Sequence, residues 1–403
     1  MLIEKLTLNG DGLASDGNTY PRVLPGEEIM IGEDGNPRIV TSSPDRIKAP
    51  CAHFKMCGGC SVQHASDTLV ADWKMSVIET GLAARGLSTE IRPILTSPAH
   101  SRRRAVMHGR RTKKGATIGF YARRSELLVD APDCVLLDPA LLAVMPALKE
   151  LTILAASRKS EVSFTLNLSD AGDVDVALTT AQSLEPRDIP RLASLAHAHK
   201  LARLSWNEEP LVTLVPPRQQ FGTAFVTPPP GAFLQATHAG EAALVDAVIQ
   251  AVGAATQVAD LFAGCGTFSL QAAQTAQVSA WEGEDSLTQT LELGWRAAED
   301  LHQVTAHTRD LFRRPVLASE LKSFDAIIID PPRAGAEAQT KEIAGSGVKR
   351  VACVSCNPVT FARDAKILTD AGYSIDWLQP IDQFRWSAHV ELVAQFTKES
   401  TKP

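Results

Sequence analysis

Residues 258–268 read Val-Ala-Asp-Leu-Phe-Ala-Gly-Cys-Gly-Thr-Phe, a short apolar run that leads into a Gly-x-Gly turn. The apolar run predicts a buried strand, and a helix is expected to begin near Thr267. Gly264 and Gly266 let the backbone approach a ligand, and the first turn of the helix offers free N–H groups. A dinucleotide-binding fingerprint would place a third glycine at Ser269, so NAD is not favoured. The stretch predicts a cofactor loop, against the alternative of an ordinary strand–turn–helix unit whose glycines serve packing.

The chain around this loop alternates between helix and buried strand. An amphipathic helix is predicted over residues 238–252. Four apolar runs follow, at residues 258–262, 278–281, 326–329 and 348–354. Such alternation predicts βαβ units and a mostly parallel, doubly wound sheet. The fold class is therefore α/β, with a Rossmann-like domain over residues 221–403.

Two acidic residues lie where an adenosyl group would be held. Glu282 ends the second predicted strand, and its carboxylate can accept hydrogen bonds from ribose hydroxyls. Asp310, in the next loop, is placed to hold an adenine amino group, although taken singly it is also an ordinary loop residue. Because the loop lacks the pyrophosphate fingerprint, the two carboxylates indicate S-adenosylmethionine as the cofactor.

A reactive thiol is predicted at the end of a strand. The loops at residues 330–335 and 355–358 both follow predicted strands, and ligands gather at such strand ends in open α/β sheets. Asn357 is suited to cap the next helix, which places Cys356 just before a helix N-terminus. The positive end of that helix is expected to lower the pKa of the Cys356 thiol and to raise its thiolate fraction. Cys353 is expected to be a small buried residue.

A carboxylate stands in an otherwise apolar strand near the end of the chain. Residues 389–396 read His-Val-Glu-Leu-Val-Ala-Gln-Phe, with Glu391 in third place. On its own, Glu391 is equally consistent with a surface residue of an edge strand. Paired with Cys356, it would have a functional role.

Four cysteines form a candidate metal centre. Cys51, Cys57 and Cys60 lie close together around a Gly-Gly pair, and Cys134 follows much later. Four thiolates bind either a zinc ion or an iron–sulfur cluster. Zinc sites usually pair two knuckles, whereas here three ligands are close and the fourth is distant. From the residues alone, both metals stay open.

Composition limits the class of protein. The chain has 403 residues, 44% of them hydrophobic and 21% charged, which is typical of a globular protein with about two to three domains. We expect a soluble, cytoplasmic protein with reduced cysteines, because no apolar window suits a membrane span and the first residues do not resemble a signal peptide. The net charge of −6 opposes bulk attraction to nucleic acid.

One segment departs from this acidic balance. Residues 101–125, here called the basic segment, carry nine Lys or Arg and no Asp or Glu. A local group of like charges indicates contact with phosphates, since the charges otherwise repel one another. The alternative is a solvated, charged hairpin.

Three domains are expected. Residues 1–50 predict a small β module, residues 51–220 an α+β region that carries the four cysteines, and residues 221–403 the Rossmann-like domain. An amphipathic helix over residues 67–85, ended by Gly86, is a candidate to pack on the catalytic domain.

Together these motifs resemble the RNA uracil-5 methyltransferases, in particular the iron–sulfur branch that modifies ribosomal RNA. The resemblance covers nearly the whole chain and rests on Cys51-x5-Cys57-x2-Cys60, Phe233-Leu-Gln235, Gly264-x-Gly266, Asp330-Pro-Pro-Arg333, Ser355-Cys-Asn-Pro358 and Glu391. It implies a class I methyltransferase domain that uses S-adenosyl-L-methionine. It also favours a [4Fe-4S] cluster over zinc, with a structural or RNA-positioning role, on Cys51, Cys57, Cys60 and Cys134.

The resemblance also implies roles for single residues. Cys356 would be the nucleophile and Glu391 the base. Cofactor contacts would come from the cofactor loop glycines and from Gln235, Phe262, Thr267, Glu282, Asp310 and Asp330. The family commonly begins with a TRAM module, an RNA-binding β barrel, which residues 1–50 would hold only in truncated form. The implied partner is RNA, with 23S rRNA favoured over tRNA, and no obligate protein partner is expected.

The implied chemistry explains why these residue types are needed. Uracil C5 is a poor nucleophile, so a thiolate first adds to C6 and makes C5 an enolate carbon that attacks the methyl group. A base then removes the C5 proton, and the thiol is eliminated. That task suits a partly buried glutamate whose pKa is raised towards neutrality. The target uridine must be single-stranded or flipped out of a helix.

Three alternatives stay open. The first is the same activity on tRNA. The second is an amino-group methyltransferase, which Asp330-Pro-Pro resembles, although Arg333 stands where an aromatic residue is usual. The third is a non-enzymatic iron–sulfur RNA-binding protein with an inert methyltransferase domain.

Overall fold

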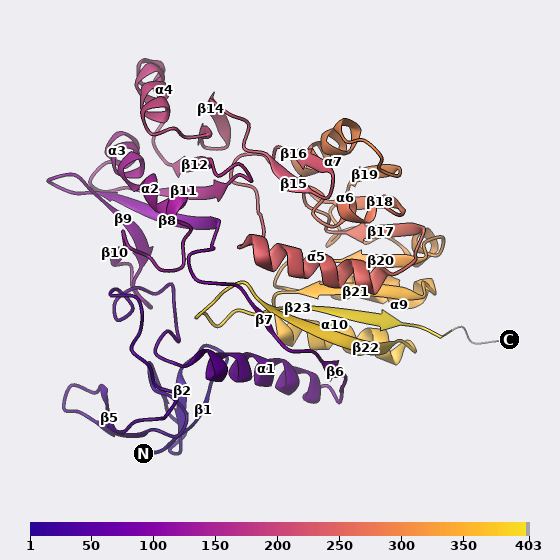
Figure 1. Cartoon of the computed structure of the whole chain (residues 1–403), viewed down its shortest axis with the longest axis horizontal. Coiled ribbons are helices and arrows are strands. Elements are labelled where there is room, and N and C mark those ends of the chain that lie inside the picture. Colours follow the sequence, from indigo (N-terminus) through magenta and orange to yellow (C-terminus); the bar gives the residue numbers. More distant parts are fainter. Residues whose placement is uncertain (400–403) are drawn as a thin grey trace.

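Residues 1–399, which the computed structural model describes, form two large β-sheets and three small ones. The largest sheet has the strand order β19-β18-β17-β20-β21-β23-β22-β6, with β7 paired to β22 (Figure 1). Its strands are β17 (Gln257–Leu261), β18 (Gln277–Glu282), β19 (Val304–Thr308), β20 (Ala326–Ile329), β21 (Arg350–Ser355), β22 (Ser374–Asp382), β23 (Glu391–Thr397), β6 (Glu90–Ile91) and β7 (Leu95–Thr96). Strands β17 to β21 are parallel, which confirms the predicted doubly wound α/β sheet.

Strand β23 is the exception to the parallel order. It runs antiparallel between β21 and β22, because β22 lies one position away from β21 and the chain then returns into the space between them. Its first residue, Glu391, is only 5% exposed. This burial excludes the alternative in which Glu391 is a surface residue of an edge strand.

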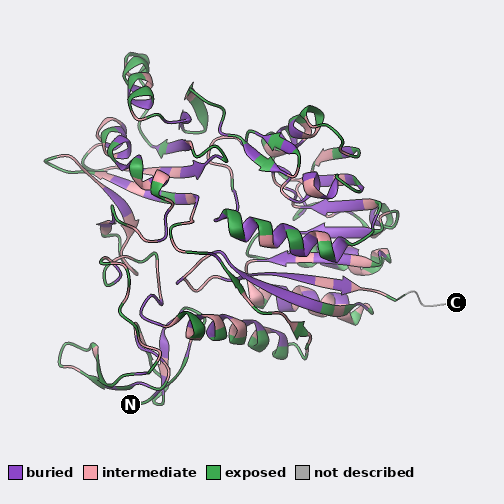
Figure 2. Cartoon of the chain, in the orientation of Figure 1, coloured by how far each residue is buried: buried purple, intermediate pink, exposed green. Residues whose placement is uncertain are grey.

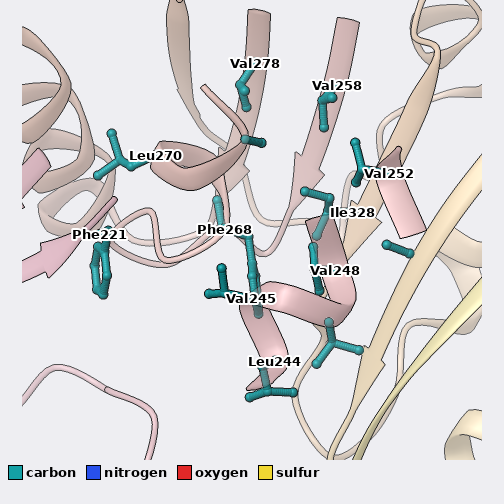
Figure 3. Packing of buried hydrophobic residues seen from close by; sticks show 14 of the residues in the cluster. Phe221, Leu244, Val245, Val248, Val252, Val258, Phe268, Leu270, Val278 and Ile328 are labelled. Atoms are coloured by element: carbon teal, nitrogen blue, oxygen red, sulfur yellow. The ribbon is translucent and has the colours of Figure 1, made fainter. Parts of the chain in front are cut away.

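Three helices cover one face of the largest sheet. They are α5 (His238–Val252), the short α6 (Ser269–Ala272) and α7 (Asp285–Ala297). The core between α5 and the strands includes Leu244, Val245, Val248, Val252, Val258, Val278 and Ile328 (Figure 3). The predicted helix over residues 238–252 is confirmed at both ends. The Thr237 side chain accepts a hydrogen bond from the first turn, and Gly253 adopts φ +62° after the last.

The other face is covered by a helix from much earlier in the chain. Helix α1 (Asp67–Ala83) contacts α10 (Pro358–Asp370), and α9 (Glu337–Ser346) packs beside α10 and against α8 (Ala318–Leu321). Ile78 and Leu82 of α1 share a core with Phe361 and Leu368 of α10. Strands β6 and β7 then join the edge of the sheet, so residues 67–96 pack on the catalytic domain. Within residues 1–399, no helix is both long and apolar enough to cross a membrane.

The second large sheet builds the middle of the chain as an α+β unit. Its strand order is β10-β9-β8-β11-β12-β13-β14. The strands are β8 (Arg104–Arg111), β9 (Ala116–Tyr121), β10 (Leu128–Asp130), β11 (Glu161–Leu168), β12 (Val174–Thr180), β13 (Arg203–Trp206) and β14 (Glu209–Thr213). Helices α2 (Pro139–Ala143), α3 (Met145–Ala155) and α4 (Ile189–Ala198) complete its core. Figure 2 shows that the strands of both large sheets are mainly buried, whereas the helices alternate between buried and exposed residues.

The remaining strands are short. Strands β15 (Gln219–Phe221) and β16 (Ala224–Val226) form a hairpin that packs on α7. The N-terminal module holds a three-stranded sheet of β1 (Ile3–Leu6), β2 (Gly12–Ala14) and β3 (Thr19–Tyr20) and a hairpin of β4 (Glu28–Ile31) and β5 (Pro37–Thr41). Its small core consists of Ile3, Ala14, Val23 and Ile29. The first fifty residues therefore hold five strands.

Two buried cations join the middle of the chain to the catalytic domain. Lys74 of α1 forms an ion pair with Asp382 at the end of β22, with 2.6 Å between Nζ and Oδ1 and 1% of each side chain exposed. Arg103 is fully buried and donates to the Glu241 carboxylate of α5 at 2.6 Å. Its backbone N–H donates to the carbonyl oxygen of Ala236 at 2.9 Å. Because a buried charge needs its partner, these pairs fix the relative position of the two units.

We predict that Lys74→Met lowers the free energy of unfolding by about 3–5 kcal/mol, because it leaves the Asp382 carboxylate buried without a counterion. Urea denaturation followed by tryptophan fluorescence measures this change. Lys341→Met is the matched control, since Lys341 pairs with Glu337 at the surface and its loss should cost less than about 1 kcal/mol. An equally small effect of Lys74→Met would contradict the prediction.

Candidate active site

A cavity of about 660 Å³ opens at the carboxyl ends of the parallel strands. Seven of the eight predicted cofactor residues line it, namely Gln235, Phe262, Gly264, Thr267, Glu282, Asp310 and Asp330. The eighth, Gly266, is not among the lining residues. A missing side chain there makes room for Leu291, because a Cβ on Gly266 would clash with Leu291 Cδ1. Gly266 therefore serves packing, whereas Gly264 lies at the cavity wall.

The cofactor loop differs from its prediction at the helix start. The helix begins at Ser269 rather than near Thr267 and contains a single turn, Ser269–Ala272. Gly266 adopts φ +100°, a conformation outside the helical region, and this delays the helix. Below the loop, the Ser269 hydroxyl donates to the buried Asp260 carboxylate at 2.5 Å. The backbone turn, rather than a long helix N-terminus, faces the cavity.

The two predicted adenosyl-binding carboxylates also hold loop backbone. Glu282 Oε2 accepts a hydrogen bond from the Gly264 N–H at 2.9 Å. Asp310 Oδ1 accepts from the Phe312 N–H at 3.0 Å. The Phe312 ring in turn lies 5.4 Å from the Phe262 ring, centroid to centroid, at the cavity wall. Phe312 was not predicted, since a single phenylalanine in a loop gives no signal in the sequence.

The antiparallel strand brings Cys356 and Glu391 to the same edge of the sheet. Ser355, the last residue of β21, is in register with Leu392 of β23. Cys356 and Glu391, one residue further on in each direction, both line the cofactor cavity. The predicted cap is confirmed, because the Asn357 side chain accepts a hydrogen bond from the N–H of Val359 at 3.1 Å.

The electrostatics of this group differ from the prediction at the thiol. The expectation of a lowered pKa for Cys356 is wrong: burial, followed by the nearby carboxylates of Glu391 and Asp330, raises it to about 11. The helix N-terminus and Arg333 do not overcome burial and two acidic neighbours. Burial and the charge of Asp330 raise the pKa of Glu391 to about 8, in the predicted direction. Burial also raises the pKa of Asp330 to about 7.

A second cavity, of about 710 Å³, meets the first at Cys356 and Glu391. Cys356, Glu391, Arg333 and Phe233 line both cavities. Only the second is lined by Arg102, Arg104, Phe384 and His389. The Arg104 guanidinium lies 5.1 Å from the centre of the Phe233 ring, which is 60% exposed. Exposed aromatic rings beside arginines are suited to stack bases and to bind phosphates.

The basic segment is only partly the anion-binding surface that its composition predicts. Arg103 is a buried structural residue. Arg110 pairs with Glu161 and Arg123 pairs with Asp11, so other segments supply the acidic partners that the segment itself lacks. Arg102 and Arg104 face the second cavity. Lys113 and Lys114 lie exposed at the β8–β9 turn, as in the alternative of a solvated hairpin.

The four predicted metal-binding cysteines gather at the same second cavity. Cys51, Cys57, Cys60 and Cys134 all line it, and none forms a disulfide. Burial raises the pKa of Cys60 to about 12, and the other three thiols add to this shift. Among residues 1–399, no group of three or more His, Cys, Asp or Glu side chains is arranged so that it could hold a metal ion.

Two features define a class I S-adenosylmethionine-dependent methyltransferase. One is the strand order, in which an antiparallel strand is inserted next to a parallel sheet, and the other is the cofactor cavity at the strand ends. Residues 227–398 match the family model described as tRNA (Uracil-5-)-methyltransferase. The chain is 41% identical to an uncharacterized RNA methyltransferase of Rhizobium meliloti, over 98% of each chain. It is 33% identical to the 23S rRNA (uracil(1939)-C(5))-methyltransferase RlmD of Halomonas elongata, covering 97% of this chain and 88% of that one.

A solved structure agrees at the level of the fold. The tRNA (uracil-54, C5)-methyltransferase of Pyrococcus abyssi, in complex with S-adenosyl-L-homocysteine, superimposes with a TM-score of 0.77. The superposition covers 98% of both chains at 24% identity. The chain belongs to the RNA (uracil-5-)-methyltransferase family and is an S-adenosylmethionine-dependent enzyme of that family.

We predict that Glu391→Gln increases the alkylation rate of Cys356 at pH 8 by about 3- to 10-fold. Removing the negative charge lowers the pKa of the thiol and raises its thiolate fraction. Timed exposure to iodoacetamide with mass spectrometry of the Cys356 peptide measures the rate. Cys265, which is 3% exposed, is the internal control and should stay unmodified in both proteins. An unchanged rate at Cys356 would show that Glu391 does not act on the thiol.

Proposed function

We propose that this enzyme methylates C5 of a uridine in 23S rRNA through a covalent bond between Cys356 and C6 of the base. The observation that carries the proposal is the meeting of the two cavities at Cys356 and Glu391. One cavity is lined by the predicted S-adenosylmethionine contacts, and the other by arginines and aromatic rings. A uridine at the junction would have a methyl donor on one side and its RNA strand on the other.

Three residues of the cofactor cavity, Cys356, Asp330 and Glu391, each have a defined step. The Cys356 sulfur bonds to C6 as the thiol proton passes to Asp330, whose pKa of about 7 leaves it about half ionised at neutral pH. The electron pair of the C5–C6 double bond moves into the enolate. C5 then attacks the sulfonium methyl group, which releases S-adenosylhomocysteine.

The last step restores the aromatic base and the free thiol. Glu391 takes the C5 proton, the C5–C6 double bond re-forms, the bond from Cys356 to C6 breaks, and the sulfur takes its proton back from Asp330. The pKa of about 8 at Glu391 suits a base that works near neutral pH. Because only the ionised carboxylate can take the proton, elimination should slow as the pH falls below 8.

The choice of ribosomal RNA rests on the relatives. The 33% identical Halomonas elongata protein is named for 23S rRNA, and its similarity extends over the cysteine-bearing region as well as the catalytic domain. The protein named for tRNA uracil-54 is similar in fold at 24% identity. We therefore propose 23S rRNA as the substrate, with tRNA as the second candidate.

We also propose that Cys51, Cys57, Cys60 and Cys134 hold a [4Fe-4S] cluster. All four line one wall of the second cavity, which supports the proposal, although among residues 1–399 the thiols are not arranged to hold a metal ion in this structure. Burial and the other three thiols raise the pKa of Cys60, so thiolates come together here only around positive charge. The chemistry of methyl transfer needs no redox step, so the cluster would serve to hold the wall of the RNA-binding cavity that these cysteines share with Arg102 and Arg104.

We predict that Cys356→Ala abolishes transfer of a radiolabelled methyl group from S-adenosylmethionine to a 23S rRNA fragment. The wild-type enzyme should form a denaturation-resistant adduct with the same RNA carrying 5-fluorouridine, because fluorine blocks the final proton removal. Gel electrophoresis under denaturing conditions detects the adduct.

Cys353→Ala, three residues earlier and within β21, is the matched control and should retain both activities. Retained transfer by Cys356→Ala would favour an amino-group acceptor. A parallel reaction with tRNA transcripts tests the substrate, and labelling of tRNA alone would overturn the ribosomal assignment.

Anaerobically purified protein should contain about four iron atoms per chain and show an absorption band at about 400 nm. Cys57→Ser should remove most of the iron, because it replaces a thiolate ligand, whereas Cys353→Ala should leave the iron content unchanged. Metal analysis by mass spectrometry measures both variants. Stoichiometric zinc without iron would rule the cluster out.

A further inference from the structure

A buried glutamine that the sequence did not single out connects the proposed base to the cofactor cavity. Gln383 follows the end of β22 and is 2% exposed. Its Nε2 donates to Glu391 Oε2 at 2.6 Å and to Gln235 Oε1 at 2.6 Å. Its Oε1 accepts from the backbone N–H of Ala236 at 2.7 Å. One side chain thus contacts both the proposed base and a residue of the cofactor cavity.

These contacts fix the orientation of the Gln383 amide. A backbone N–H can only donate, so the amide oxygen must face Ala236 and the NH2 group must face the two side-chain oxygens. Both N–H groups of Gln383 are then used. The amide has no free donor left for substrate, which makes it a support for Glu391 and Gln235 rather than a group that binds the substrate.

We propose that Gln383 is a positioning residue that holds the Glu391 carboxylate and directs the C5 proton to Glu391 Oε1. The proposal rests on the proposed role of Glu391 as the base. Because Oε2 accepts a hydrogen bond from Gln383, Oε1 is the oxygen left for the proton. When Glu391 carries that proton, Oε2 still accepts from Gln383, so the contact persists through the transfer.

The same amide orients Gln235. Since Gln235 Oε1 accepts from Gln383, its own NH2 group is turned away from Gln383, and the residue lines the cofactor cavity. A glutamine held this way presents donors to the cavity. Loss of Gln383 would therefore release two side chains of the site at once, the proposed base Glu391 and the proposed cofactor contact Gln235.

Buried ion pairs hold Gln383 itself in place. The preceding residue, Asp382, is fixed by Lys74 of α1. The Gln235–Ala236 backbone is held from the other side by Arg103, which donates to the carbonyl oxygens of both residues. Since these anchors come from α1 and from the start of β8, elements outside the catalytic domain set the position of the base.

The charged groups around Glu391 determine how its pKa should change when Gln383 is replaced. Asp330 raises the pKa of Glu391 and the Gln383 hydrogen bond lowers it. Cys356 lies close to Glu391, Asp330 and Arg333. His389, two residues before Glu391, lies near Arg333, Lys74 and Arg102, and its pKa is lowered by burial and by these cations. None of these groups is changed by a neutral replacement of Gln383.

The test is the variant Gln383→Met, which keeps the length of the side chain and removes its hydrogen bonds. Under single-turnover conditions, release of the methylated RNA from the enzyme should slow about 10- to 100-fold, as expected when a reacting group loses its fixed position. The acidic limb of the pH–rate profile should move up by about one pH unit, the size expected for a lost hydrogen bond to a charged group. The covalent RNA adduct should accumulate, because elimination slows more than addition.

The matched control is Gln379→Met, four residues earlier in β22. Gln379 is also buried, at 8% exposed, and donates to the carbonyl oxygens of Pro93 and Pro380 outside the site. It should show an unchanged pH profile and no extra adduct. A profile for Gln383→Met that matches this control would overturn the proposal.

A second variant keeps the proposal testable if Gln383→Met does not fold. Gln383→Glu keeps the shape but places a carboxyl group against Glu391, so the acidic limb should again move upwards; an unmoved limb would count against the proposal. Glu391→Gln separates the two levels of inference. If it retains full elimination, the proposed base is wrong, whereas if it blocks elimination while both Gln383 variants behave as wild type, only the inference about Gln383 fails.

Discussion

The antiparallel return of β23 between β21 and β22 is the constraint on which the active site depends. A parallel strand delivers only its carboxyl end to the ligand-binding edge of the sheet, so five parallel strands cannot supply a residue from the beginning of a strand. Because β23 runs the other way, its first residue, Glu391, reaches that edge next to the loop that carries Cys356. The two residues that we propose to act on adjacent ring carbons are thereby held by neighbouring strands.

This arrangement places three titratable groups in one partly buried volume. Burial raises the pKa values of Cys356, Glu391 and Asp330 alike, since each charged form loses hydration and the carboxylates repel the thiolate. At neutral pH the Cys356 thiol and most of the Glu391 carboxyl groups therefore keep their protons, whereas Asp330 is about half ionised. Such a site suits the roles proposed for two of these residues. The Cys356 thiol would react only once a uracil ring is bound, and the Glu391 carboxyl group would accept and release a proton near neutral pH.

Segments that precede the catalytic domain in the sequence also stabilise it. Helix α1 covers one face of the catalytic sheet, and Lys74 and Arg103 reach the loops behind the active site. The basic segment shows why composition is an ambiguous guide, because its arginines divide among structural pairs, the cavity wall and the solvent. The role of each arginine depends on whether an acidic residue such as Glu241, Glu161 or Asp11 lies opposite it. Those acidic partners are far away in sequence.

The sequence by itself determined the doubly wound fold, the family, and the residues that meet at the junction, because helix and strand periods, glycine turns and short motifs are local patterns. It could not determine the pKa of Cys356, the packing role of Gly266 or the late start of α6, since these depend on which groups lie across the cavity and on a backbone angle. It also missed Gln383, Phe312 and the partners of Lys74 and Arg103. A glutamine or a lysine acquires such a role only through neighbours that tertiary structure brings within hydrogen-bond distance, and burial then makes each of those contacts necessary.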